Sequence, residues 1–253
     1  MLAAGVGARL GLGEDFAPKA LLNFGGKTLL QRHIEILRYL GVRELVIGVG
    51  HQADMILAEI GALGAEDFVR TVMNPVYRQG PITTLWSVRQ EFDSAEPVIL
   101  MDADVLYDHR IMERLIESDP ENCFLMDREV EPGEEPVKLC MRDGRLVDFH
   151  KTPTEPHEFY GEWIGFLKLS PGMAGRVPGA TKPYIDRGET DLLYEVAVRD
   201  LVLADGGFGV EEVTGLPWIE IDFVDDVKRA QTVILPQLEP LPIGSARIGQ
   251  ARG

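Results

Sequence analysis

The residues with the clearest chemical potential lie at the start of the chain, in Leu2-Ala3-Ala4-Gly5-Val6-Gly7-Ala8-Arg9 and the later pair Pro18-Lys19. Gly5 and Gly7 have no Cβ atom, so the backbone can approach a nucleotide and direct N–H groups at phosphate oxygens. Arg9 adds a planar guanidinium and Lys19 a mobile ammonium, and both groups bind phosphate. The next glycine is Gly11, so the spacing of dinucleotide-binding turns is absent. The segment predicts a nucleotide phosphate-binding loop, with a simple strand-to-helix turn as the alternative.

Four carboxylates lie at the ends of two apolar, strand-like segments that are far apart in the sequence. Asp102 and Asp104 end the first segment, and Glu220 and Asp222 end the second. Because side chains alternate along a strand, the members of each pair point to the same face. Carboxylate oxygens brought together in this way form a site that Mg²⁺ prefers, with positions left for phosphate and water. Strand-end capping is the alternative role for Asp102 and Asp104.

These motifs together resemble the signature of the NTP-transferase superfamily, which includes sugar-phosphate nucleotidyltransferases and cytidylyltransferases. The resemblance extends over most of the chain, through residues 2–9, 18–19, 25–30, 101–106, 161–165 and 215–222. The last of these segments, with residues 74–77 and Ser87, is similar to the phosphocholine cytidylyltransferase-like branch. Residues 80–84 depart from that branch, which has an asparagine in this region.

The resemblance implies a role for each site residue. Arg9 and Lys19 would be the catalytic cations, and Lys151 would contact the phosphate of the acceptor. Glu162 would face the polar or cationic end of the acceptor. The nucleotide would be bound by Leu2, Ala3, Ala4, Gly5, Gly7, Arg9, Lys19 and Asp102. The metal would be held by Asp104, Asp222 and Glu220, with Glu220 as either a direct or an outer ligand.

Aromatic residues are numerous enough to build a cage around an ammonium group, which aromatic faces attract. They include Tyr77, Trp86, Tyr160, Trp163, Tyr184 and Trp218. We assign Trp86 and Tyr184 to the acceptor site, because strand alternation places Trp163 on the face opposite Glu162. Packing in the core is the alternative role for each of these residues.

Strand-like and helix-like segments alternate along the chain. Apolar spacing predicts helices over residues 29–40 and 191–203 and a third around Ile111 and Leu115. Short apolar runs predict strands over residues 45–49, 97–101, 122–126, 137–141, 146–149, 162–169 and 218–221. This alternation predicts an α/β fold, a doubly wound, mostly parallel mixed sheet with helices on both faces, as in Rossmann-like nucleotidyltransferases. Ligands of such sheets bind at the carboxyl ends of the strands.

We expect one nucleotidyltransferase domain over residues 1–235 and a flexible tail over residues 236–253, which are rich in Pro and Gly. Only Met1 and Leu2 precede the glycine loop, whereas a central strand typically has ~5–6 residues. Either this strand begins upstream or it is unusually short.

Composition narrows the class of protein. The 253 residues carry a formal net charge of −16, which argues against nucleic acid or an anionic membrane as a partner. No apolar run approaches the ~20 residues that span a bilayer, and no signal peptide is evident. The two cysteines predict buried, reduced thiols. These features favour a cytoplasmic enzyme, and a homodimer stays open.

We therefore expect a CTP-dependent cytidylyltransferase that uses Mg²⁺, transfers CMP to a small acceptor and releases pyrophosphate. The acceptor would carry a phosphate or phosphonate, as phosphocholine and 2-aminoethylphosphonate do. Alternative enzymes are a sugar-1-phosphate nucleotidyltransferase and a molybdopterin-type guanylyltransferase, each using another NTP. A nucleotide-sensing regulatory module is the alternative outside enzymes, and the intact Arg9, Lys19, Asp104 and Asp222 argue against it.

Overall fold

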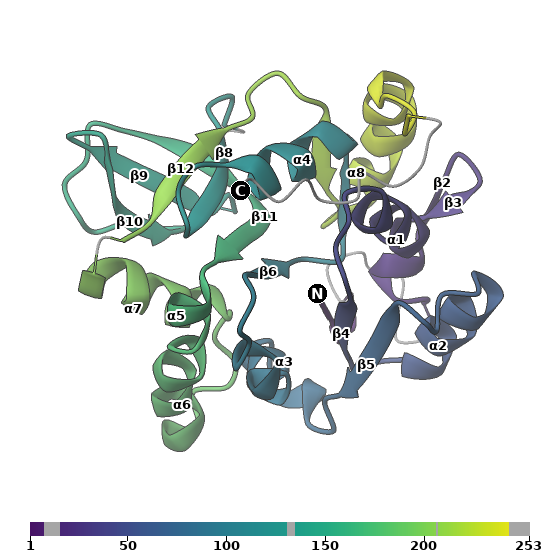
Figure 1. The fold of residues 1–253 in the computed structure, drawn as a ribbon, viewed down its shortest axis with the longest axis horizontal. Helices are drawn as coiled ribbons and strands as arrows, with labels where there is room; N and C mark the ends of the chain where they lie inside the picture. Colours follow the sequence, from purple (N-terminus) through teal and green to yellow (C-terminus); the bar gives the residue numbers. More distant parts are fainter. Residues whose placement is uncertain (8–15, 131–134, 206, 243–253) are drawn as a thin grey trace.

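The computed structural model describes residues 1–7, 16–130, 135–205 and 207–242 (Figure 1). Its strands are β1 (Leu2–Ala3), β2 (Asn23–Phe24), β3 (Lys27–Thr28), β4 (Leu45–Val49), β5 (Val69–Met73), β6 (Val98–Met101), β7 (Val105–Tyr107), β8 (Cys123–Asp127), β9 (Lys138–Arg142), β10 (Arg145–His150), β11 (Phe159–Leu169), β12 (Gly209–Glu212) and β13 (Trp218–Glu220). Its α-helices are α1 (Leu29–Tyr39), α2 (Ala53–Ala62), α3 (Ile82–Ser87), α4 (His109–Glu117), α5 (Pro171–Ala174), α6 (Val177–Arg187), α7 (Glu195–Asp205) and α8 (Val224–Arg229). Short helical turns are η2 (Lys19–Leu21), η3 (Tyr77–Gln79), η4 (Arg89–Phe92), η5 (Ala230–Ile234) and η6 (Leu235–Gln237).

The sheet is mixed, as the sequence predicts. Its amino-terminal half is parallel, with β1 and β5 on either side of β4, and a parallel bridge from Leu2 to Asp102 connects β1 to the end of β6. The other half is organised around β11, which pairs antiparallel with β6, β8 and β9. Strand β12 then adds to β8 in parallel. Thus β11 connects the parallel half to the strands beyond it.

Side-chain alternation separates two large cores on the two faces of the sheet, and the described residues include a smaller third cluster around Phe24 and Leu106. In β8, Cys123 and Leu125 pack with helices α1, α2 and α4, whereas Phe124 and Met126 pack with α3 and α7. The same alternation separates Phe166 from Leu167 in β11. Because both faces of the central strands are apolar, each face needs a cover of helices. The predicted arrangement, with helices on both faces, is confirmed.

Helix α1 shows how local sequence sets an element. The Thr28 hydroxyl accepts the backbone N–H of Gln31 at 3.0 Å and caps the first turn. Leu30, Ile34 and Leu37 follow at helical spacing and are buried. The predicted helix over residues 29–40 therefore matches α1 to within one residue.

The predicted strand boundaries lie within one residue of the structure, except that β11 begins at Phe159, three residues earlier than predicted. Helix α7 begins at Glu195, four residues later than predicted, so Tyr194 lies just before its first turn. Within the described part of the predicted tail, the backbone N–H of Glu239 donates to Asp108 Oδ2 at 2.8 Å and Leu238 packs against a buried cluster. Residues 243–253, which make up the rest of that predicted tail, lie outside the described residues.

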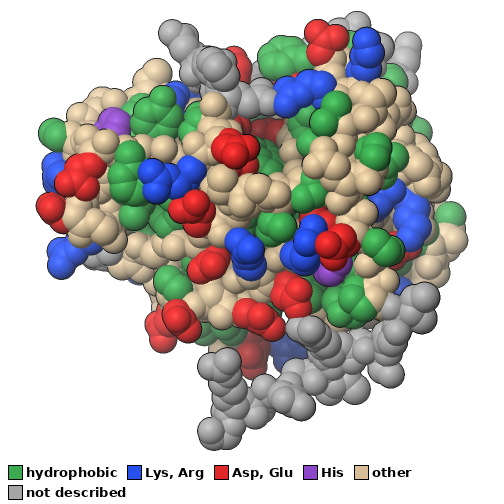
Figure 2. Space-filling view, turned by 90° about the horizontal axis from the view of Figure 1, so that it is seen from above, with side chains coloured by type: hydrophobic (Ala, Val, Ile, Leu, Met, Phe, Trp, Pro, Cys, Tyr) green, Lys and Arg blue, Asp and Glu red, His purple; other side chains and the backbone are tan. Residues whose placement is uncertain are grey.

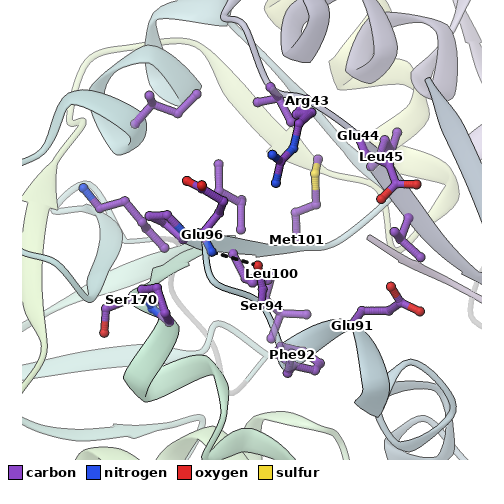
Figure 3. Close-up of a pocket in the computed structure, with 18 of the residues that line it drawn as sticks. Arg43, Glu44, Leu45, Glu91, Phe92, Ser94, Glu96, Leu100, Met101 and Ser170 are labelled. Carbon is purple, nitrogen blue, oxygen red and sulfur yellow. Dashed lines mark hydrogen bonds between the residues drawn. The ribbon is translucent and has the colours of Figure 1, made fainter. Parts of the chain in front are cut away.

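A large cavity of about 1180 Å³ lies between the starts of β4 and β6 (Figure 3). Its walls include Arg43, Glu44, Leu100, Met101 and Ser170. It opens at the amino-terminal ends of the parallel strands, where ligands of open α/β sheets do not usually bind. None of the helices in the described part of the chain is long and apolar enough to cross a membrane.

Candidate active site

A cleft of about 520 Å³ opens at the carboxyl ends of β1 and β6. This is the edge at which open α/β sheets bind their ligands. Most of the site residues predicted from the sequence line this cleft, namely Leu2, Ala3, Ala4, Gly5, Gly7, Lys19, Asp102, Asp104, Lys151, Glu220 and Asp222. The fold therefore brings together residues that are separated by up to about two hundred positions in the sequence.

The glycine loop enters the cleft directly after β1. The carbonyl of Ala4 accepts the backbone N–H of His51 at 3.2 Å, which fixes the exit of the strand. Gly7 has φ = 62°, in the left-handed region that glycine occupies without strain. The predicted catalytic residue Arg9 lies outside the described residues.

Lys19 stands at the centre of the cleft. Its Nζ atom lies 2.9 Å from Asp104 Oδ2 and 2.7 Å from Asp222 Oδ1. Burial lowers the pKa of this ammonium, but the carboxylates of Asp104 and Asp222 outweigh burial and raise it above the usual lysine value. The Lys19 side chain is only 17% exposed, and its two ion pairs hold the ammonium against the carboxylates of the cleft.

The acidic cluster is assembled by antiparallel pairing of β13 with β7. Glu220 pairs with Val105, and the N–H of Ile221 donates to the carbonyl of Asp104 at 3.0 Å. This pairing places one carboxylate oxygen each from Asp104, Glu220 and Asp222 within 4.8 Å of one another. Three hard oxygen donors at this separation suit a divalent cation such as Mg²⁺.

The charge on this cluster is only partly compensated by Lys19. Desolvation, followed by the neighbouring carboxylates of Asp104 and Asp222, raises the pKa of Glu220 well above its usual value. A divalent cation between these groups would remove that repulsion and restore an ordinary carboxylate. The charge of the cluster and the spacing of its oxygen atoms therefore both suit a divalent cation.

Asp102 lies on the other side of the cleft, supported by β11. Its backbone N–H donates to the carbonyl of Gly165 at 3.0 Å, and its Oδ1 accepts the Tyr194 hydroxyl at 2.8 Å. Gly165 has φ = 86°, and a Cβ atom there would lie 3.2 Å from Asp102 Oδ2. Burial, then Asp104 and Glu195, raises the pKa of the Asp102 carboxyl well above its usual value.

Lys151 reaches the cleft from the loop after β10. Its Nζ atom pairs with Glu135 Oε2 at 2.9 Å, and its carbonyl accepts Lys138 Nζ at 2.7 Å. The backbone of Lys151 is thus anchored, while its ammonium is held by a carboxylate that is itself 56% exposed. An anionic ligand in the cleft can compete for this ammonium.

Three residues predicted for the acceptor site lie elsewhere. Trp86 is stacked under Arg89, whose guanidinium lies 4.7 Å from the ring centroid. Tyr184 donates to Asp200 Oδ2 at 2.7 Å on the outer side of α6 and α7. Glu162 lines an adjacent cavity of about 510 Å³ that shares Glu135, Glu220 and Asp222 with the cleft. Trp86 and Tyr184 are therefore absent from the described walls of the cleft.

The wall of the cleft contains three other residues instead, Trp163, Tyr194 and Glu195. Burial, followed by the carboxylates of Asp102, Glu195 and Glu220, raises the pKa of Tyr194 well above its usual value. Sequence reasoning missed Tyr194 and Glu195 because it placed them inside a regular helix. The adjacent polar pair at the true start of α7 was the available signal.

A glycine loop, a lysine and a three-carboxylate cluster at the carboxyl edge of a mixed sheet form a cleft suited to a phosphate-bearing ligand and a divalent cation. The chain belongs to the family of MobA-like NTP transferase domains, whose family model matches residues 1–150. The protein is therefore a nucleotidyltransferase.

Two curated relatives cover almost the whole chain. One is the CMP-5'-(3-aminopropyl)phosphonate synthase of Streptomyces rubellomurinus, with 28% identity over 94% of this chain. The chain spans only 39% of the length of that relative. The other is the CTP:phosphoglutamine cytidylyltransferase of Campylobacter jejuni, with 23% identity over 90% of this chain and 96% of the relative.

Solved structures show the same fold. The CTP:phosphocholine cytidylyltransferase of Streptococcus pneumoniae matches with a TM-score of 0.71 and 22% identity, over 91% of this chain and 95% of that one. The inositol-1-phosphate CTP transferase of T. maritima also has a TM-score of 0.71, with 18% identity over 94% of this chain and 96% of that one. At these identities the likeness supports the fold, and the predicted α/β fold class is confirmed.

Proposed function

We propose that the protein is a cytidylyltransferase that transfers CMP from CTP to a small acceptor carrying both a phosphate or phosphonate and an amine. The two curated relatives described above are named for transfer from CTP or for a CMP product. One observation carries the choice of acceptor, namely that Asp102 and Glu195 line the same cleft as Lys19 and Lys151, with the Tyr194 hydroxyl donating to Asp102 Oδ1 at 2.8 Å.

The acceptor has to satisfy two opposite environments within one cleft. Lys19 and Lys151 suit an anionic phosphorus group, whereas Asp102, Glu195 and the Tyr194 hydroxyl suit a cationic group. The largely buried rings of Tyr194 and Trp163, with centroids 6.3 Å apart, form the apolar wall beside these groups. A short ω-aminoalkyl phosphonate or phosphate combines both groups in one molecule, and a neutral sugar phosphate does not.

The reaction needs no covalent enzyme intermediate. An anionic oxygen of the acceptor attacks the α-phosphorus of CTP, and the bond from that phosphorus to the bridging oxygen of the β-phosphate breaks. Pyrophosphate leaves with the bonding electron pair, so atoms and charge balance without an added reactant. The acceptor oxygen is already ionised at neutral pH, so no general base is needed. The chain contributes by positioning both reactants and stabilising charge.

The carboxylates of Asp104, Asp222 and Glu220 would hold a magnesium ion. Bound there, Mg²⁺ would neutralise phosphate charge and orient the leaving pyrophosphate. With its two carboxylate partners engaged by the ion, Lys19 would be available to contact a phosphate oxygen. Arg9 would add a second cation from the glycine loop.

A pyrophosphate-release assay tests the proposed function. The four NTPs are each combined with 2-aminoethylphosphonate, 3-aminopropylphosphonate, phosphocholine and glucose-1-phosphate, with and without Mg²⁺. We expect CTP with an amine-bearing acceptor to give the highest kcat/KM. Equal or higher activity with glucose-1-phosphate would favour a sugar-1-phosphate nucleotidyltransferase instead. Pyrophosphate release with no combination would contradict the proposal.

A further inference from the structure

A buried ion pair joins the two segments that carry the acceptor side of the cleft. Asp148 in β10 is fully buried, and Arg199 of α7 binds both of its oxygens, with Nε at 2.7 Å from Oδ1 and Nη2 at 3.0 Å from Oδ2. The pairing register of β10 shifts between Leu146 and Asp148, and such bulges redirect side chains.

The same carboxylate also fixes the loop that follows β10. Asp148 Oδ2 accepts the backbone N–H groups of Thr154 at 2.7 Å and Glu155 at 3.1 Å. Arg199 Nη2 donates to the Thr154 hydroxyl at 2.8 Å, which closes the network. The loop between Asp148 and Thr154 contains Lys151, so its two ends are tied to one carboxylate.

The other end of the ion pair lies one helical turn from the cleft. Arg199 follows Glu195 by four residues, so both lie on the same side of α7. Glu195 and the preceding Tyr194 line the same cleft as Lys151. The Asp148–Arg199 pair thus connects the loop that contains Lys151 to the helix that begins at Glu195.

We propose that Asp148 and Arg199 are positioning residues that set the separation between Lys151 and the Tyr194–Glu195 pair, and that this separation selects the chain length of the acceptor. This inference rests on the proposed function, because it assigns the two ends of the acceptor to those groups. The bidentate geometry supports it, since a guanidinium fork fixes both distance and orientation.

The energetics explain why this pair can serve as a rigid connection. Although burial raises it, hydrogen bonds from Arg199, Glu155 and Thr154 outweigh burial and hold the pKa of Asp148 below its usual range. The carboxylate therefore stays ionised at neutral pH, and loss of its partner would leave a buried charge uncompensated. Lysine in place of Arg199 keeps the charge but loses the fork, so R199K changes geometry with the least damage to folding.

The test measures acceptor discrimination in R199K and in a matched control. Arg187 forms a similar two-nitrogen contact with Glu189, but at an exposed position outside the cleft, so R187K is the control. With CTP at saturation, kcat/KM is measured for 2-aminoethylphosphonate and 3-aminopropylphosphonate. We expect R199K to change the ratio of the two values by about fivefold or more and to leave KM for CTP within about twofold. R187K should change neither quantity.

An unchanged ratio in R199K, together with a lower Tm, would show that the pair is only structural and would overturn the proposal. D148N gives a second variant, because an asparagine accepts the same backbone N–H groups but no longer carries the charge that holds Arg199. It should change the ratio in the same direction as R199K, and opposite changes would also contradict a common positioning role.

Amide hydrogen exchange separates this inference from the proposed function. In R199K, exchange should become faster both in residues 151–155 and in residues 192–196, whereas R187K should affect neither segment. Faster exchange in only one segment would show that the pair does not connect them. If the wild-type protein uses no amine-bearing acceptor, the proposed function fails, and the exchange experiment still decides whether the connection exists.

Discussion

Lys19 is the residue on which the charge balance of the active site depends. It contacts Asp104 and Asp222, two of the three carboxylates suited to a metal ion. The cation and the metal therefore share ligands, so a bound metal and Lys19 compete for the same oxygens. The triphosphate offers Lys19 an alternative partner when substrate binds.

Asp104 provides the first test at this scale. The variant Asp104→Asn keeps the shape of the side chain but removes a charged oxygen donor from the cluster. We expect kcat to fall by about 10²-fold or more, the scale for loss of a principal electrostatic stabiliser. EDTA should abolish activity of the wild type, and Mg²⁺ should restore it. Asp186→Asn, at an exposed pair on α6, is the control. Full activity in EDTA would contradict metal dependence.

Substitution of Lys19 provides a second test. Lys19→Met should lower kcat/KM by the equivalent of about 2–3 kcal/mol, because a charged phosphate contact is lost. It should also lower the Tm of the metal-free protein, since Asp104 and Asp222 lose their cation. Thermal melts with and without Mg²⁺ check this point, and Mg²⁺ should stabilise the variant more than the wild type. An unaltered Tm without metal would mean that the two ion pairs contribute little to stability.

Glu195 and Glu162 distinguish the acceptor site in the structure from the one expected from the sequence. Glu195 lines the cleft beside Tyr194, whereas Glu162 lines the neighbouring cavity. We expect Glu195→Gln to raise KM for an amine-bearing acceptor about tenfold, because a charged contact becomes neutral. KM for CTP should stay within about twofold. Glu162→Gln should have the smaller effect, and steady-state kinetics showing the reverse order would move the ammonium site into the neighbouring cavity.

At the scale of elements, β11 holds the two halves of the sheet together and also shapes the cleft. Its pairing with β8 shifts between Trp163 and Leu167, and Gly165 lies within this irregular stretch. The carbonyl of Gly165 accepts a hydrogen bond from the backbone N–H of Asp102 and so helps to fix the position of Asp102. A strand interrupted in this way can present Trp163 to the cleft and still pair with strands on both sides.

Substitution of Gly165 tests this role of β11. Alanine would have to adopt φ near 86° and would place its Cβ atom 3.2 Å from Asp102 Oδ2 and from Val105 Cγ2. We expect Gly165→Ala to lower the free energy of unfolding by about 1–3 kcal/mol and to reduce kcat as Asp102 shifts. Denaturant unfolding and kinetics measure the two effects. Gly179→Ala on α6, where an added Cβ meets nothing within 4 Å, is the control. Wild-type stability in Gly165→Ala would show that the strand relaxes freely.

At the scale of the whole molecule, acidic side chains dominate the charge. The formal net charge is −16, and Figure 2 shows acidic side chains scattered over one face, mostly in its left and lower parts, interspersed with Lys and Arg. Such a surface repels anionic substrates at long range. Under the proposed function, binding of CTP and a phosphonate would therefore depend on the local cations of the cleft and on a divalent ion.

The global stability of the fold should depend on pH through His33. Burial, mainly, lowers the pKa of this side chain to about 4; the nearby amino terminus adds to the effect, and a hydrogen bond with the carbonyl of Ala103 opposes it. Because the folded value lies below the unfolded value of about 6.5, the unfolded chain takes up the proton first. Stability should be full above about pH 6.5 and decline by about 3 kcal/mol toward pH 4.

Urea unfolding of the wild type and of His33→Gln between pH 7 and pH 4 measures the contribution of His33 to the free energy of unfolding. The variant should be less stable at pH 7 but should lose less stability on acidification. Parallel declines in the two proteins would assign the acid sensitivity to other groups.

Residue type and local spacing were enough to predict which residues of the chain meet in the candidate active site. Gly5, Gly7 and Lys19 were predicted as a phosphate loop, and Asp104 and Asp222 as carboxylates at strand ends, because each prediction needs only neighbours in the sequence. The apolar periodicity of α1 and β4 likewise depends on neighbours a few residues away. All five residues line one cleft in the structure.

The side chains that line the cleft beside Asp102 could not be predicted from the sequence, because their directions depend on tertiary packing. Trp86 and Tyr184 have suitable chemistry but face Arg89 and Asp200, whereas Tyr194 reaches the cleft because α7 begins one residue after it. A helix that started four residues earlier would have turned Tyr194 to another direction, since each residue rotates the side chain by about 100°. The direction of a side chain depends on the register of its element, and long-range packing sets that register.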